Sequence, residues 1–330
     1  MFLSFIVPVY NAESYIGECL QSLLEQDLPK ENYEIICIND GSRDGSLSVL
    51  QQFAREYPNI VVIDKENGGV ATARNAGLAA AGGEYVWFID SDDFIKKNVL
   101  GKLCGVARTG KYDRLIIGCY FFQDALTEEE AQLSREGKLP LNGPWYDSVV
   151  VRSIFRRSYL TQHDLTFRYP EITHGEDGMF MYEAVIPGPE SFLIDEAIYF
   201  YRCHSGSAET TISVENRQKK LRSYIRIAKI LLDYYRNKGQ KNVLTANKLM
   251  SFLWMAMYEI TKLPDAEARE ALGELRQAGL YPFRRLPECS LEKSYLIGRS
   301  DLLGKAVDSV LQNLHRPWAY HIMRLIQKLK

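Results

Sequence analysis

Residues 85–93 read Tyr-Val-Trp-Phe-Ile-Asp-Ser-Asp-Asp, and this stretch is the best guide to the fold. The apolar run 85–89 has the length and composition of a buried strand. Polar residues follow at once, and three of them, Asp90, Asp92 and Asp93, are carboxylates that repel one another unless a cation such as Mg²⁺ or Mn²⁺ is bound. Ser and Asp also suit the N-terminus of a helix. The stretch therefore predicts a strand, and leaves a metal site and a helix cap as alternatives.

The chain before this stretch repeats the order of strand, polar turn and helix. Apolar runs at 3–9, 34–38 and 60–63 predict three more strands, and the turns Tyr10-Asn11 and Asn39-Asp40 follow the first two. Apolar residues at helical spacing predict helices over 13–26, 46–57 and 70–81. This alternation predicts an α/β fold with a mostly parallel sheet flanked by helices. Because ligands bind at the carboxyl ends of such strands, we expect the polar turns to meet at one edge.

Two of the turns are candidate binding elements. Asn67-Gly68-Gly69 precedes a predicted helix whose start could admit a phosphate, with Arg74 as the counter-charge. Asp40 is either a plain turn residue or an acceptor for a hydrogen bond from a base or ribose. The absence of a G-x-G-x-x-G or Walker motif weakens the case for a dinucleotide or a nucleoside triphosphate.

Candidate catalytic residues stand in the second half of the chain. In His174-Gly175-Glu176-Asp177-Gly178, one carboxylate could act as general base towards a hydroxyl, although a solvated acidic turn has the same pattern. Residues 201–207 read Tyr-Arg-Cys-His-Ser-Gly-Ser. There His204 either binds a metal or a diphosphate, or only caps the turn.

The pattern changes after residue 122. Residues 123–150 lose periodicity and are expected to form a mobile or variable loop, order returns at 149–160, and 191–201 is expected to be a strand. From residue 215 onward, including 243–262 and 265–279, the pattern is helical. We therefore expect one domain over 1–212 and a smaller all-helical region over 213–330.

The composition is that of a soluble protein. The chain has 330 residues, 46% of them hydrophobic and 25% charged, and a net charge of −2, which gives no reason to expect a nucleic-acid partner. The six cysteines include no C-x-x-C pair and are expected to be buried free thiols. We see neither a signal peptide nor a run of about 18 apolar residues, so a cytoplasmic protein is expected.

Taken together, the motifs resemble those of family 2 glycosyltransferases. Residues 5–11 (Phe-Ile-Val-Pro-Val-Tyr-Asn), 38–44 (Ile-Asn-Asp-Gly-Ser-Arg-Asp), 68–77 with Ala73-Arg74-Asn75, and 90–93 have that family's order and spacing. Glu176-Asp177 and the Tyr-Arg-Cys-His turn at 201–204 resemble its later motifs. The resemblance covers roughly residues 3–207, and the helical remainder has no such motif.

The resemblance implies a GT-A fold and an inverting transferase that uses a nucleoside-diphosphate sugar, commonly a UDP-sugar. It divides the first domain into a nucleotide-sugar half, about 1–122, and an acceptor half, about 145–212. Asp177 would be the catalytic base, with Glu176 positioning the acceptor or the donor sugar. Asp40 would accept from the uracil N–H, and the nucleotide-sugar-binding residues would be Pro8, Tyr10, Asn11, Glu13, Asp40, Gly68, Arg74, Asn75, Ser91 and Asp92. The candidate ligands for Mn²⁺ or Mg²⁺ are Asp90, Asp92, Asp93 and His204.

The expected reaction moves a hexosyl or N-acetylhexosaminyl group to a hydroxyl of a glycan or a lipid-linked acceptor, in the synthesis of a cell-surface polysaccharide. Two alternatives rank below it. A sugar nucleotidyltransferase would need a glycine-rich, basic loop after the first strand, where residues 8–13 are neither. A non-catalytic glycan-binding protein on the same fold would be expected to have lost acidic residues that are all present.

Residues 316–330 predict an amphipathic helix. One face is apolar (Trp318, Ile322, Leu325, Ile326 and Leu329), and Arg324 and Lys328 lie opposite. Such a helix either packs on the helical region or lies at a membrane surface. The resemblance favours the second interpretation to some degree, because many such transferases act on lipid-linked acceptors. A peripheral contact with the inner face of the membrane is therefore one expectation.

Overall fold

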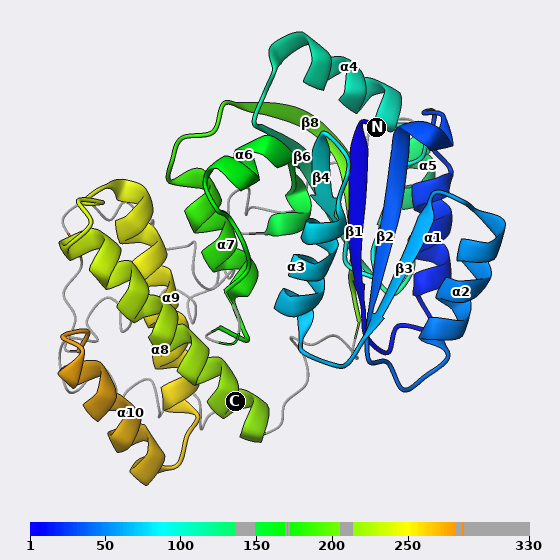
Figure 1. Cartoon of the computed structure of the whole chain (residues 1–330). Coiled ribbons are helices and arrows are strands. Elements are labelled where there is room, and N and C mark those ends of the chain that lie inside the picture. Colours follow the sequence, from blue (N-terminus) through cyan, green and yellow to red (C-terminus); the bar gives the residue numbers. More distant parts are fainter. Residues whose placement is uncertain (136–148, 169, 171, 205–213, 282–285, 287–330) are drawn as a thin grey trace. The chain divides into compact units, whose positions relative to one another are not determined.

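The computed structural model of the chain describes residues 1–135, 149–168, 170, 172–204, 214–281 and 286. Its N-terminal half has every strand and helix that the sequence predicts there (Figure 1). Helices α1 and α2 lie on one side of the sheet, and α3 lies on the other. The elements are β1 (Leu3–Val9), α1 (Ile16–Leu24), η1 (Lys30–Asn32), β2 (Tyr33–Asp40), α2 (Ser46–Glu56), β3 (Ile60–Lys65), α3 (Val70–Ala80) and β4 (Tyr85–Phe88).

The described strands form one sheet in the order β3-β2-β1-β4-β7-β6-β8-β5. Strand β7 (Ser153–Arg156) is antiparallel to its neighbours β4 and β6 (Arg114–Gln123), and β5 (Phe94–Ile95) is antiparallel to β8 (Ser191–Cys203). The other neighbours are parallel. Helices α4 (Leu100–Gly110), α6 (Arg157–Gln162) and α7 (Glu176–Val185) flank this sheet. The predicted α/β fold with a mostly parallel sheet is confirmed.

A proline inside the buried central strand β1 is compatible with its pairing. Pro8 lies opposite Ile38 of β2, while the pairing of β1 with β4 ends at Ile6. The last bond on the β4 side is donated by the backbone of Ile89 to the carbonyl of Ile6. The backbone groups of residue 8 point to the β4 side, as those of Ile6 do two residues earlier, but β4 has already ended there. The N–H that proline lacks would therefore have had no partner in the sheet.

The expectation of an irregular loop over residues 123–150 is wrong in part, because helix α5 (Glu128–Arg135) lies within it and η2 (Val150–Arg152) begins at its end. Thr127 and Glu130 form a capping box at the start of α5. The Glu130 carboxylate accepts from the backbone N–H of Thr127 over 2.8 Å, and the Thr127 hydroxyl accepts from the N–H of Glu130 over 3.2 Å. The spacing Thr-x-x-Glu is a helix-start signal that the polar composition of the segment obscures.

The contacts between Cα atoms divide the chain into two compact units. Among the described residues, one unit contains those up to 168 together with 176–204, and the other contains 170, 172–175 and the C-terminal helices. These helices are α8 (Val214–Arg236), α9 (Val243–Thr261) and α10 (Asp265–Gln277). The Asn242 side chain caps α9 by accepting from the backbone N–H of Thr245 over 2.9 Å.

The described cysteines are free thiols, and most of them are buried. Four cysteines, Cys19, Cys37, Cys104 and Cys119, are buried free thiols as expected, and Cys203 is free and partly buried. The sixth, Cys289, and the predicted amphipathic helix 316–330 lie outside the described residues. No helix in the described part of the chain is long and apolar enough to cross a membrane.

Candidate active site

The turn after β1 is tied to the turn after β2. The backbone N–H of Asn11 donates to Ser42 Oγ over 3.1 Å, and Asn11 Oδ1 accepts from the N–H of Arg43 over 2.8 Å. The Glu13 carboxylate accepts from the N–H of Gly45 over 2.9 Å, at the start of α2, where a negative charge is stabilised by the helix dipole. Asn11 and Glu13, both expected to bind the nucleotide sugar, therefore brace the two loops.

Pro8 and Tyr10, which were also expected to bind the nucleotide sugar, differ in exposure. Pro8 is buried within β1, whereas Tyr10 is 50% exposed. Of this pair, only Tyr10 presents its side chain to a ligand.

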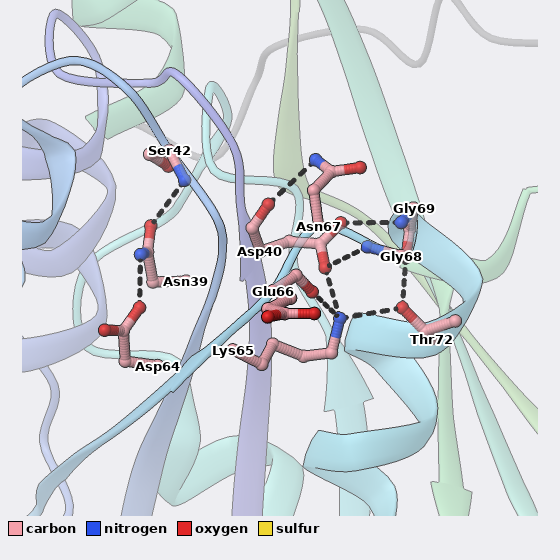
Figure 2. A network of polar contacts seen from close by, with 10 residues as sticks. All are labelled: Asn39, Asp40, Ser42, Asp64, Lys65, Glu66, Asn67, Gly68, Gly69 and Thr72. Atoms are coloured by element: carbon pink, nitrogen blue, oxygen red, sulfur yellow. Dashed lines mark hydrogen bonds and ion pairs between the residues drawn. The ribbon is translucent and has the colours of Figure 1, made fainter.

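Asp40 organises the glycine turn that precedes α3 (Figure 2). Its carboxylate accepts from the backbone N–H groups of Gly68 and Gly69 over 3.0 and 2.7 Å, and from Lys65 Nζ over 2.5 Å. The Asn67 amide donates to the Asp40 carbonyl over 2.8 Å. The carboxylate is 4% exposed, so it occupies the start of α3 much as a bound anion would. Asp40 and Gly68 are thus brought together, and Lys65 joins them without having been predicted.

Glycine is required in this turn. Gly69 has a φ of +86°, a conformation that other residues rarely adopt. A Cβ at Gly41, where φ is +69°, would lie 2.8 Å from the backbone nitrogen of Asn67. Gly69 is therefore required for its backbone conformation, and Gly41 both for its conformation and for its close approach to Asn67.

Arg74 links two acidic segments that are far apart in the sequence. It is 5% exposed, donating through Nη2 to Asp90 Oδ1 over 2.8 Å and through Nη1 to Glu176 Oε1 over 3.0 Å. Burial acts to lower the pKa of Arg74, but the carboxylates of Asp90 and Glu176 outweigh it and hold the guanidinium charged. The predicted residues Arg74, Asp90 and Glu176 are therefore one network. In it, Arg74 binds protein carboxylates, whereas the sequence suggested a nucleotide contact.

Asp93 is the structural member of the 90–93 cluster. It is 2% exposed, and its carboxylate accepts from Tyr199 Oη over 2.5 Å and from the backbone N–H of Arg202 over 2.7 Å. The N–H of Asp90 donates to the same Tyr199 oxygen over 3.1 Å. Burial and the neighbouring Asp92 raise the pKa of Asp93 well above its usual range. Both carboxylate oxygens of Asp93 thus attach the turn to β8.

Asp92 lies beside His204, and both are candidate metal ligands from the sequence. Asp92 Oδ2 is 2.9 Å from His204 Nε2, and the Asp92 side chain is 30% exposed. Burial and Asp90 raise the pKa of Asp92, while the contact with His204 lowers it. The ring of Tyr15 packs against His204, with 4.7 Å between the ring centres. Asp92 is therefore more accessible than the buried Asp93 of the same turn.

The side chain of Arg202 supports the turn at Asp92. Its Nε donates to the Asp92 carbonyl over 2.9 Å, and its Nη2 to Glu18 over 2.5 Å. Sequence reasoning placed Arg202 in a motif without assigning it a role, and it missed Tyr199. Both act on residues more than a hundred positions away, so no local signal could have identified them.

Glu176 and Asp177 begin α7 and differ in exposure. Glu176 is 9% exposed, whereas Asp177 is only partly buried and its Oδ1 accepts from the N–H of Gly178 over 2.6 Å. Burial and the adjacent Asp177 raise the pKa of Glu176 to about 7, against the opposing effect of Arg74. The more accessible carboxylate at this position is therefore that of Asp177.

One further predicted residue has a structural partner. Asn75 makes two hydrogen bonds of 2.8 Å to the backbone of Phe167, one through its amide nitrogen and one through its oxygen. It holds the chain that leads towards α7. Ser91 lies in the 90–93 turn and is partly exposed.

Among the described residues, no group of three or more Asp, Glu, His or Cys side chains is arranged to hold a metal ion by itself. The pair Asp92 and His204 provides two donors. One or two carboxylates together with substrate phosphates and water are usual for Mg²⁺, so the carboxylate of Asp92 fits a metal shared with a diphosphate.

Comparison with known proteins gives a consistent picture. Residues 4–183 match the family model described as Glycosyl transferase family 2. A poly(ribitol-phosphate) beta-glucosyltransferase of Bacillus spizizenii is 33% identical in an alignment of length 219 that covers 61% of this chain and 32% of that protein. The uncharacterized glycosyltransferase EpsJ of Bacillus subtilis is 34% identical in an alignment of length 218 that covers 61% of this chain and 60% of that protein. The chain thus spans less than two thirds of the length of these relatives.

A solved structure has a similar fold. The 1-349 fragment of TarS from Staphylococcus aureus, in complex with UDP-GlcNAc, superimposes with a TM-score of 0.68 and 22% identity. The match covers 99% of this chain and 91% of that fragment. At this identity the likeness concerns the fold, and it confirms the predicted GT-A-type architecture.

Proposed function

We propose a function for this chain from one premise: it belongs to glycosyl transferase family 2. The proposed reaction transfers a hexosyl or N-acetylhexosaminyl group from a UDP-sugar to an acceptor hydroxyl, with inversion. The observation that supports it best is the network around Arg74, which joins Asp90 at the end of the central strands to Glu176 at the start of α7. The donor-side turn and the residue that precedes the proposed base are thereby bound to one buried cation.

The nucleotide is proposed to bind over the carboxyl ends of β1 and β2. Tyr10 is exposed there and can lie against the base, since an aromatic face stacks well on a planar ring. Asp40 is proposed to recognise the uracil N–H. Since its carboxylate already accepts from Gly68, Gly69 and Lys65, binding would share or displace one of these bonds.

A divalent cation, Mn²⁺ or Mg²⁺, is proposed to be held by Asp92 with His204. Asp93 is a weaker candidate for this role than the sequence suggested, because its two oxygens bind Tyr199 and Arg202. When bound, such a cation stabilises the negative charge that develops on the departing diphosphate. Asp90, bound to Arg74, is proposed to support the turn.

The chemical step is proposed to be a single in-line displacement. The acceptor oxygen forms a bond to the anomeric carbon while the bond from that carbon to the phosphate oxygen breaks, and UDP leaves. The proton of the acceptor hydroxyl passes to the carboxylate of Asp177, which acts as general base. Glu176 is proposed to position Asp177 and the sugar, because its own carboxylate is buried against Arg74.

The acceptor is proposed to be a hydroxyl of a cell-surface polysaccharide or of its lipid-linked precursor. Two relatives are named for transfer to poly(ribitol-phosphate), one of them a glucosyltransferase and the other an N-acetylglucosaminyltransferase. The names support a carbohydrate acceptor.

A thermal-shift screen of nucleotide sugars tests the donor assignment. UDP-hexoses and UDP-N-acetylhexosamines are compared with the GDP- and CMP-sugars, each with and without Mn²⁺. A ligand present at a hundred times its Kd stabilises the folded state by roughly 2.7 kcal/mol. Stabilisation by UDP-sugars that grows with Mn²⁺ is expected, and a preference for another base would contradict the donor assignment.

A further inference from the structure

The residues that lead into Glu176 are held by the helical unit. The backbone N–H of Thr173 donates to Ser223 Oγ over 3.2 Å, and the hydroxyls of the two residues lie 3.1 Å apart. Ser223 lies on α8 and is 3% exposed. One residue further on, His174 Nε2 lies 2.9 Å from Asn216 Oδ1 of the same helix. The segment is therefore attached to α8 at consecutive positions.

Gly175 fixes the direction in which the chain leaves this attachment. Its φ is +76°, which other residues rarely adopt. A Cβ there would lie 2.8 Å from a ring carbon of Phe252 on α9 and 3.2 Å from a methyl carbon of Ile227 on α8. Both of these side chains are buried, so the backbone passes close to a packed surface and has little room to shift.

Glu176, the next residue, belongs to the other unit and is bound there by Arg74. The peptide bond between Gly175 and Glu176 thus joins a residue fixed by the helical unit to a residue fixed by the GT-A unit. Asp177, the proposed base, follows directly.

We infer that the helical unit has a positioning role in catalysis, in which Ser223 of α8 anchors Thr173 and so sets the position of the Glu176-Asp177 pair. This inference rests on the proposed function. Thr173 and Ser223 act through the intervening peptide and are positioning residues. A base displaced by about 1 Å can lose about a hundredfold in rate, whereas nucleotide binding is proposed to depend on residues 8–92. Loss of the Thr173–Ser223 contact should therefore lower kcat without lowering the affinity for the nucleotide.

The test compares hydroxyl deletions on the two sides of the contact in the full-length protein. Ser223→Ala removes the acceptor of the Thr173 N–H. Thr173→Val removes the hydroxyl of an exposed residue, together with its contacts to Ser223 Oγ and, over 3.2 Å, to His174 Nδ1. Thr173→Ser keeps that hydroxyl. Ser251→Ala is the matched control, because Ser251 on α9 bonds only its own helix, at the Asn247 carbonyl over 2.9 Å.

The readouts are kcat for release of UDP from a UDP-sugar and Kd for UDP by calorimetry. We expect kcat to fall roughly tenfold or more in Ser223→Ala and by less in Thr173→Val, with Kd unchanged. Thr173→Ser and Ser251→Ala should match the wild type. If Ser223→Ala does not fold, the contrast between Thr173→Val and Thr173→Ser decides the question.

Two outcomes overturn the inference. One is a kcat in the two deletion variants equal to that of Ser251→Ala. The other is a loss of UDP affinity as large as the loss of kcat, which indicates general damage to the fold. Failure of the proposed function is distinct, because the wild-type protein itself would then release no UDP from any UDP-sugar.

Discussion

Replacing Arg74 by methionine removes the positive charge that Asp90 and Glu176 share. Methionine is flexible and unbranched and can fill much of the same space. The change leaves Asp90 and Glu176, whose side chains are 28% and 11% exposed, without their shared counter-charge. Removing one partner of a buried ion pair costs about 3–5 kcal/mol. Because Asp90 is partly solvated, we expect a loss near the lower end, about 3 kcal/mol, and attribute most of it to Glu176.

The loss should depend on pH. Burial raises the pKa of Glu176 to about 7, above the value of 4.5 for an ordinary glutamate, so between these values the folded state binds more protons than the unfolded state. The free energy of unfolding therefore falls as pH rises from about 4.5 to about 7. Removal of Arg74 raises the pKa of Glu176 further, so that this fall continues to a higher pH. Near about pH 5, Glu176 is mostly protonated with or without Arg74, so the variant should lose less there than near about pH 8.

Urea unfolding followed by circular dichroism measures this difference at the two pH values. The matched variant Arg74→Met with Glu176→Gln has no carboxylate at position 176, and it should recover part of the stability lost near about pH 8. An equal loss at both pH values, with no recovery in the double variant, would refute the role assigned to the Arg74–Glu176 pair.

Three further predictions concern single carboxylates. Asp177→Asn should lower kcat by about a hundredfold or more while UDP affinity measured by calorimetry stays unchanged, and a dead Glu176→Gln beside an active Asp177→Asn would reverse their roles. Asp92→Asn should weaken Mn²⁺-dependent UDP binding by at least about tenfold with the melting temperature retained, whereas the exposed control Asp195→Asn should bind as the wild type does. Asp40→Asn should cost about 1–3 kcal/mol in urea unfolding, because an amide cannot accept from all three donors of the glycine turn, and unchanged stability would show that the turn does not depend on that carboxylate.

The sequence was sufficient where structure is determined locally. Strand β1 coincides with the predicted run 3–9, and α3 ends one residue before the predicted limit. In both, the period of the apolar residues and the flanking turn signals agree. Strand β5 is different, because it consists of Phe94 and Ile95 alone and exists through its pairing with β8, about a hundred residues later. No window of local sequence contains that information.

The candidate site shows the same limit at the level of single side chains. The sequence predicted one acidic group of Asp90, Asp92 and Asp93. Their environments differ in the structure, because each contacts residues from a distant part of the chain. Tyr199 donates a hydrogen bond to Asp93 and His204 lies beside Asp92, whereas Arg74 binds Asp90. Residue types and spacing predicted where charges gather, and the long-range contacts decide which of them a ligand can reach.

The most direct test of the proposed reaction is turnover of the donor. Purified full-length protein is incubated with UDP-hexoses and UDP-N-acetylhexosamines in the presence of Mn²⁺, and released UDP is measured beside the Asp177→Asn variant. We predict that at least one UDP-sugar gives UDP in excess over the protein, and that the variant loses this release while it still binds UDP. The proposal would be contradicted if the wild type released no more UDP than Asp177→Asn from every UDP-sugar tested.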